Sequence, residues 1–119
     1  MREDLCLAIH KGRILGLVSR ADALELYTPD AIHERPDHVL LPGLVNTHTH
    51  AAMTLMRGYG EDMSLERWLN ERIWPTEVRL MSADFVADGV RLAISEMLLG
   101  GITCFADMYF YPERASEIA

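Results

Sequence analysis

The sequence predicts an α/β fold in which two parallel strands are joined by a helical crossover. Two segments, 38–48 and 102–107, combine apolar and β-branched residues in the way that strands do. Residues 83–99 between them have the apolar periodicity of a long helix. The order strand, helix, strand is typical of a parallel βαβ unit with a right-handed crossover.

The N-terminal region predicts a hairpin followed by a short helix. Residues 5–10 and 13–18 are short apolar segments, and Lys11-Gly12 suits the tight turn between them. Ser19 is the expected N-cap of a helix over Ala21–Tyr27. A connector that contains prolines and charges follows this helix.

Helical pieces are expected between the two strands. Residues 51–57 predict one or two turns that end at Gly58. Ser64 is expected to start a helix that continues through Ile73, and Pro75 suits the first position of the next piece.

The long helix 83–99 has recognisable ends. Ser82 is its expected cap, Gly100-Gly101 its expected stop, and Pro112 is expected to begin a final helix after the second strand. The stripe that should face the core consists of Val86, Val90, Ala93, Ile94, Met97 and Leu98.

Composition restricts the class of protein. The chain has 119 residues, about one domain's worth, and half of them are hydrophobic. A net charge of −7 argues against nucleic acid or an anionic membrane as a partner. The apolar runs are too short to span a bilayer, and the N-terminus lacks the apolar core of a signal peptide. Cys6 and Cys104 fall in strands expected to be buried, so free thiols and a cytoplasmic location are predicted.

His48 and His50 are the residues most suggestive of chemistry. Two residues apart at the end of a strand, their side chains should point to the same face. Imidazole nitrogens suit zinc and other transition metals, and the C-terminal ends of strands carry the sites of βα-barrels. A tight site needs three or four ligands, and ordinary strand histidines remain the alternative.

Three further residues are interpreted from their positions in the expected elements. Asp107 ends the second strand and either orients a ligand histidine or touches substrate, or caps the following loop or helix. Glu77 near an expected helix start is explained by the helix dipole alone. Trp68 lies at helical spacing from other apolar residues, which predicts core packing.

The segment Leu40–Gly58, with its Pro-Gly-Leu-Val-Asn-Thr-His-Thr-His core, resembles the first-strand signature of the amidohydrolase superfamily. Further marks in family order are Glu61-Asp62, Leu65–Leu69, Trp74-Pro-Thr-Glu77 and Gly100–Tyr109. The resemblance is to the chlorohydrolase/deaminase branch, and within it to 5-methylthioadenosine/S-adenosylhomocysteine deaminases. It covers about residues 38–112.

The resemblance implies the first part of a metal-dependent (βα)8 TIM barrel over 38–119, preceded by part of a small β-sandwich in 1–37. It implies that His48 and His50 are metal ligands, most often to zinc. Glu77 would bind ribose hydroxyls, and Trp68 would line the nucleoside pocket. The implied reaction is hydrolytic deamination: water activated by the metal attacks C6 of adenine and ammonia leaves.

The same resemblance implies that much of the site lies elsewhere. The family has two further ligand histidines, a proton-shuttling glutamate and an aspartate on later strands, and none can be placed here. We therefore expect the isolated chain to be incomplete and inactive. The alternatives are another amidohydrolase, acting on guanine, cytosine or triazine-type substrates, and a non-catalytic chain that self-associates or binds a complementing chain.

Overall fold

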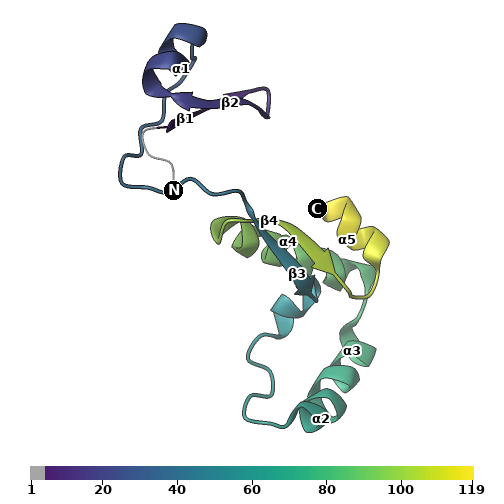
Figure 1. The fold of residues 1–119 in the computed structure, drawn as a ribbon. Helices are drawn as coiled ribbons and strands as arrows, with labels where there is room; N and C mark the ends of the chain where they lie inside the picture. Colours follow the sequence, from purple (N-terminus) through teal and green to yellow (C-terminus); the bar gives the residue numbers. More distant parts are fainter. Residues whose placement is uncertain (1–4) are drawn as a thin grey trace. The chain divides into compact units, whose positions relative to one another are not determined.

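The chain divides into two compact units in the computed structural model, which describes residues 5–119 (Figure 1). The first unit ends at Leu40 and the second comprises Leu41–Ala119. This division is by contacts alone, and the sandwich and barrel assignments of the two parts stay predictions.

The first unit is a hairpin with one helix. Strands β1 (Leu5–His10) and β2 (Arg13–Ser19) pair antiparallel, as predicted. Lys11 and Gly12 both have positive φ, 48° and 73°, which is the geometry of the two-residue turns that match strand twist. Helix α1 (Arg20–Leu26) starts at the expected cap, where the Ser19 hydroxyl accepts a hydrogen bond from the amide of the third helical residue at 3.1 Å.

The second unit is built on a parallel strand pair. Strand β3 (Leu44–Thr49) lies beside β4 (Ile102–Asp107), and the long helix α4 (Ala83–Leu99) connects them through the crossover (Figure 1). The predicted parallel βαβ arrangement is therefore confirmed. Because both strands run in the same direction, their C-terminal ends meet at one edge of the sheet.

The predicted extent and burial of the strand at 38–48 were wrong. Strand β3 begins only at Leu44, whose amide makes the first ladder bond to the Gly101 carbonyl at 2.8 Å. Pairing cannot start earlier, since β4 itself begins at Ile102 and Pro42 has no N–H to donate. Leu44 and Val45 are 54% and 60% exposed because β4 is the single strand paired to β3 within residues 5–119.

The cysteines also depart from the prediction of burial. Cys104 on β4 is exposed, and Cys6 on β1 is half-buried. Among the residues that the structure describes, each lies in a sheet of two strands, so neither strand is flanked on both edges. Both thiols are free.

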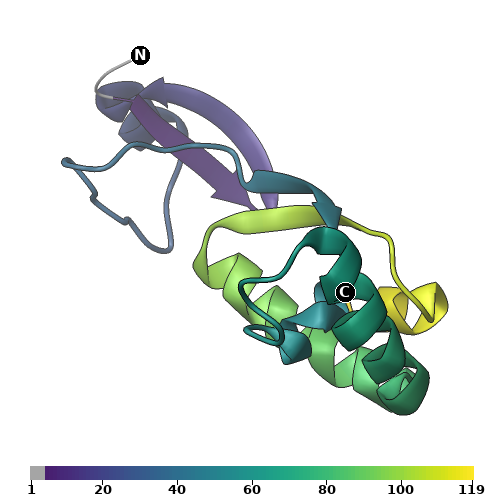
Figure 2. The ribbon, with the colours of Figure 1, turned by 90° about the horizontal axis from the view of Figure 1, so that it is seen from below.

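Helical structure between the strands is continuous where a break was expected. After the short 3-10 helix η1 (Ala51–Met56), α2 (Leu65–Trp68), the π-turn η2 (Leu69–Ile73) and α3 (Trp74–Leu80) form one helical arm (Figure 2). The expected start at Ser64 is confirmed by its 3.4 Å side-chain cap. Pro75 lies in the first turn of α3, as predicted, although helical conformation continues into α3 from η2. It has no N–H and its ring crowds the carbonyl four residues back, which the chain accommodates with a wider π-turn.

The core of the second unit lies between α4 and η1. Both Ala51 and Ala52 of η1 are buried against α4, where Gly89 leaves room for the close approach. A Cβ at Gly89 would lie 2.6 Å from the Ala52 carbonyl oxygen. The short side chains thus set how near the two helices come. The buried cluster consists of Ala51, Ala52, Val86, Val90, Ala93 and Ala115.

Helix α4 has the predicted bounds, and its predicted stripe is correct except at one end. Ser82 caps the helix by accepting from the Phe85 amide at 3.1 Å, and Gly101 (φ 80°) ends it. Leu98, expected in the core, is 60% exposed. It lies about 100° around the helix from Met97, beyond the part of the helix that packs.

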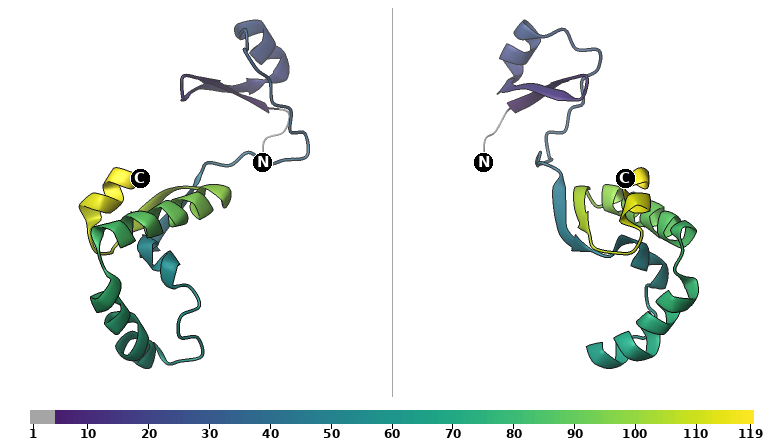
Figure 3. Two further views of the ribbon diagram at one scale, coloured as in Figure 1. Left: turned by 180° about the vertical axis from the view of Figure 1, so that it is seen from behind. Right: turned by 90° about the vertical axis from the view of Figure 1, so that its right-hand side faces the viewer.

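The last helix is α5 (Pro112–Ile118), which starts at the proline as predicted and packs against α4. Helices α4 and α5 lie on one side of the strand pair (Figure 3). No helix between residues 5 and 119 combines the length and apolar character that crossing a membrane requires.

Candidate functional site

The two histidines lie side by side at the end of β3, as the spacing predicted. Their ring centroids are 5.2 Å apart and the rings are nearly perpendicular, at 84°. The pairing of β3 with β4 is irregular here. Asn46 pairs with Phe105 and Thr49 with Asp107, so β3 has one more residue than β4 between these two pairs. Strict alternation is therefore interrupted, and the rings meet in spite of it. Both histidines are exposed.

A backbone carbonyl from the neighbouring strand end orients His50. Its Nδ1 lies 2.6 Å from the Met108 carbonyl oxygen. Because a carbonyl oxygen can only accept, Nδ1 carries the hydrogen, and Nε2 is the nitrogen that a neutral ring offers to a metal. Metal-ligating histidines in proteins are generally held by such a bond through their other nitrogen. This arrangement fits a metal ligand.

Asp107 holds the backbone that follows the dyad. Its Oδ1 accepts a hydrogen bond from the Ala51 amide at 2.8 Å, which satisfies a buried donor at the start of η1. The predicted cap of the loop or helix after Asp107 was wrong, because the carboxylate instead accepts from the first residue of η1, which follows β3. The carboxylate positions the residue directly after His50. A contact of Asp107 with substrate stays a prediction.

Glu77 is buried, and its environment differs from the one expected. It is 9% exposed and its Oε1 accepts a hydrogen bond from the Tyr109 hydroxyl at 2.7 Å. Glu77 lies in the first turn of α3, as expected, although helical conformation continues into α3 from α2 through η2. Burial raises the pKa of Tyr109 above its usual value, and the hydrogen bond to Glu77 raises it further. The phenol therefore keeps its proton and donates it to the Glu77 carboxylate in a hydrogen bond.

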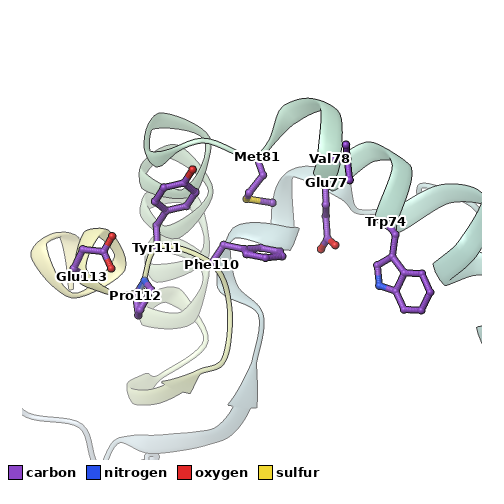
Figure 4. Close-up of a pocket in the computed structure, with 8 residues that line it drawn as sticks. All are labelled: Trp74, Glu77, Val78, Met81, Phe110, Tyr111, Pro112 and Glu113. Atoms are coloured by element: carbon purple, nitrogen blue, oxygen red, sulfur yellow. The ribbon is translucent and has the colours of Figure 1, made fainter.

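A cavity of about 550 Å³ opens beside Glu77. In Figure 4 the Glu77 carboxylate points into the space between the Phe110 and Trp74 rings. The volume is in the range of small-ligand sites, and a carboxylate between two aromatic rings offers both a polar and an apolar contact surface. The residues that line it are Trp74, Glu77, Val78, Met81, Phe110, Tyr111, Pro112 and Glu113.

Trp68 faces a second, separate hollow. Its indole nitrogen donates to the Tyr59 carbonyl at 2.9 Å, and the ring is half-buried rather than part of the core. The hollow, of about 320 Å³, also contacts the loop at 57–61. The structure therefore does not bring Trp68 and Glu77 into one cavity.

Sequence reasoning missed Tyr109 and the two aromatic rings beside Glu77. Tyr109 follows Asp107 by two residues, and the Asp-Met-Tyr run at a strand end was the available signal. Its partner Glu77 lies 32 residues earlier, beyond the reach of any local pattern. Over residues 5–119, no cluster of three or more His, Cys, Asp or Glu side chains is placed to hold a metal.

Comparisons with known proteins identify the family of this chain. Residues 39–119 match the model of the amidohydrolase family. The chain belongs to the amidohydrolase family. Among its relatives is a 5-methylthioadenosine/S-adenosylhomocysteine deaminase of Teredinibacter turnerae, 50% identical over 97% of this chain and 26% of its own length. A 5′-deoxyadenosine deaminase of Methanococcoides burtonii is 42% identical over 93% of this chain and 24% of its own length.

A solved structure is also similar. The crystal structure of an adenosine deaminase from Xanthomonas campestris with bound zinc superposes with a TM-score of 0.94 at 44% identity. The match covers 98% of this chain and 27% of the crystallised one. The chain thus spans about a quarter of the length of the relatives that it matches. A family member crystallised with zinc supports a divalent metal in this amidohydrolase.

Proposed function

We propose that this amidohydrolase segment supplies the first metal ligands and part of the nucleoside pocket of a hydrolytic deaminase. The substrates would be adenine nucleosides of the 5-methylthioadenosine/S-adenosylhomocysteine type, because relatives with that name match nearly the whole chain. The single observation that carries the proposal is the His48–His50 pair, with His50 oriented by the Met108 carbonyl.

The dyad suits a divalent metal, most naturally zinc. A bound zinc supplies activation of water for attack on the adenine ring. His50 would ligate through Nε2, since its Nδ1 is engaged by Met108, and His48 would ligate beside it. Two imidazoles are fewer than the three or four ligands of a tight zinc site, so we propose that the others lie outside residues 5–119. For the same reason the segment by itself would turn over no substrate.

Glu77 would bind the ribose. One of its oxygens accepts from Tyr109, and the carboxylate faces the cavity, where it can accept hydrogen bonds from sugar hydroxyls (Figure 4). Trp74 and Phe110 offer apolar faces on either side. Trp68 would join this pocket only through a movement of the loop between it and η1, since its ring now faces the other hollow.

Two other functions compete with this proposal. An amidohydrolase that acts on a free base or a triazine has no sugar for Glu77 to bind, so the buried carboxylate at the cavity favours a nucleoside. A non-catalytic role by association is favoured by the exposed apolar side chains of Leu44 and Val45 on β3.

The first experiment measures zinc content of the purified chain by elemental analysis, with its molar mass from light scattering. We expect about one zinc per chain, or per assembly that completes the ligand set, and its loss in a His48→Ala/His50→Ala variant. Because both rings are exposed, the variant should fold as the wild type does. Zinc retained at wild-type stoichiometry by the variant would exclude the dyad as the metal site.

The reaction itself is tested in a complete enzyme. These residues would replace the matching 26% of the Teredinibacter turnerae deaminase, and conversion of 5-methylthioadenosine to the inosine product would be followed by absorbance. Deamination of the nucleoside and not of guanine or cytosine supports the proposal. Activity on a free base alone would favour the second function, and no activity with a properly assembled, zinc-loaded chimera would favour association.

A further inference from the structure

The end of β4 contacts three different parts of the candidate site in consecutive residues. Asp107 accepts from the Ala51 amide at 2.8 Å, and the Met108 carbonyl lies 2.6 Å from Nδ1 of His50. The hydroxyl of Tyr109 donates to Glu77 at 2.7 Å. The first two contacts hold the metal dyad and the chain after it. The third reaches a separate element, helix α3.

The ring of Tyr109 is itself held in place. Its centroid lies 5.8 Å from the His50 ring and 5.1 Å from the Phe110 ring. Packing on two aromatic neighbours leaves the phenol few alternative orientations. The hydroxyl is therefore presented to α3 from a rigid position at the strand end.

Glu77 depends on this contact for its orientation. A glutamate has three side-chain torsions, and ordering them costs conformational entropy that a hydrogen bond to the carboxylate can offset. Tyr109 is the side-chain donor that the structure provides for Glu77 within residues 5–119. With Oε1 engaged, Oε2 is the oxygen left for the cavity.

We propose that Tyr109 is a positioning residue for nucleoside recognition, which holds Glu77 so that the carboxylate meets the ribose hydroxyls. It acts through Glu77 and does not itself contact the substrate. The inference rests on the function proposed above and deepens it. It assigns sugar specificity to a pair formed between the end of β4 and α3.

The test compares two nucleosides in the complete chimeric deaminase. Tyr109→Phe removes the hydroxyl and keeps the ring that packs on His50 and Phe110. We expect the dissociation constant and KM for adenosine to rise about tenfold, the loss typical of a hydrogen bond to a charged group, with kcat little changed. The same variant should bind 2′,3′-dideoxyadenosine as wild type does, since that ligand has no hydroxyls for Glu77. Zinc content should be unchanged.

Two further variants complete the design. Tyr27→Phe is the matched control, because it makes the same chemical change in the first unit and should alter neither constant. In a Glu77→Ala background, adding Tyr109→Phe should cause no further loss of adenosine affinity. That cycle also keeps the inference testable if the single variant is poorly folded, since the two backgrounds are compared directly.

The outcomes separate the two proposals. If the wild-type chimera binds adenosine and its dideoxy analogue equally, Glu77 does not read the ribose, and both the pocket proposal and this inference fail. If wild type discriminates and Tyr109→Phe discriminates equally well, this inference alone fails. Equal weakening toward both ligands, or loss of zinc, would show a general structural role and would also overturn it.

Discussion

The layer between α4 and η1 and the polar cluster at the ends of β3 and β4 are built by different physics. In the first, small apolar residues such as Ala52 and Val90 are fully buried and the packing is close. In the second, His48 and His50 are exposed, and hydrogen bonds rather than burial set the geometry. Burial supplies folding free energy, whereas oriented polar groups supply a site. Substitutions should therefore affect stability in one region and ligand binding in the other.

Ala51 belongs to both regions. Ala51 is 1% exposed and belongs to the buried cluster, yet its amide donates to Asp107 in the polar cluster. It also directly follows His50. A change at this junction should affect both properties at once, and changes on either side should affect one.

The largest effect on stability is expected for Gly89→Ala. The new methyl group would meet the Ala52 carbonyl oxygen at 2.6 Å, and a backbone atom cannot rotate away. Overpacking of this kind costs about 3 kcal/mol, of which the better helix propensity of alanine returns about 1, for a net loss of about 2 kcal/mol. Urea unfolding followed by circular dichroism measures it.

Gly100→Ala is the matched control for that substitution. It makes the same change at the end of the same helix, where φ is −85° and the nearest backbone oxygens lie 3.4 and 3.5 Å from the added carbon. We expect little change in the free energy of unfolding. Equal destabilisation by the two substitutions would mean that contact with η1 is not what Gly89 provides.

Asp107→Ala should cost less stability but should act on both regions. The buried Ala51 amide would lose its acceptor, at about 1.5 kcal/mol of folding free energy. Because the amide directly follows His50, zinc affinity should also fall, by about tenfold as for other groups that orient a ligand. Chemical denaturation and competition with a chelator measure the two quantities. Asp107→Asn keeps an acceptor oxygen and should recover most of the stability and most of the zinc affinity. If Asp107→Ala kept full zinc affinity, the hydrogen bond to Ala51 would stabilise the fold without affecting the histidine pair.

The smallest effect concerns an exposed ion pair at the rim of the core layer. Arg57 donates to both carboxylate oxygens of Glu96, at 3.0 and 2.5 Å, and this hydrogen bonding lowers the pKa of Glu96. A carboxyl with a depressed folded-state pKa stabilises the fold above its unfolded pKa of about 4.3, and that contribution is lost as pH falls through the folded pKa. Glu96→Gln should lower Tm slightly at pH 7.

Comparison of Tm at pH 7 and at pH 3 tests the small stabilisation from the Arg57–Glu96 ion pair. The difference between wild type and Glu96→Gln should shrink at the lower pH and in high salt, since the pair is solvent-exposed. Glu66→Gln, on the exposed face of α2, is the control and should leave Tm unchanged at both values. A difference that persists at pH 3 would mean that Glu96 stabilises by packing and not by charge.

Local signals in the sequence determined most element boundaries. The hairpin turn at Lys11-Gly12, the cap at Ser82 and the stop at Gly101 were predictable because each depends on the conformation of one or two residues. The same holds for the parallel order of β3 and β4, which follows from the alternation of element types along the chain. The spacing of His48 and His50 also predicted their side-by-side placement, although the register shift between Asn46 and Thr49 interrupts the alternation on which that prediction rests.

Only the tertiary structure decided what depends on residues distant in sequence. The start of β3 at Leu44 is set by where β4 begins, and the burial of Glu77 is set by Tyr109 on another element. The orientation of His50 by Met108 likewise joins residues 58 apart. Local conformational preference acts over a few residues, and such contacts form only when the chain has folded. The sequence by itself therefore determined the strand, helix and histidine pattern. The pairing of β4 with β3, and the contact of Tyr109 with Glu77 on α3, decided how these residues form a site.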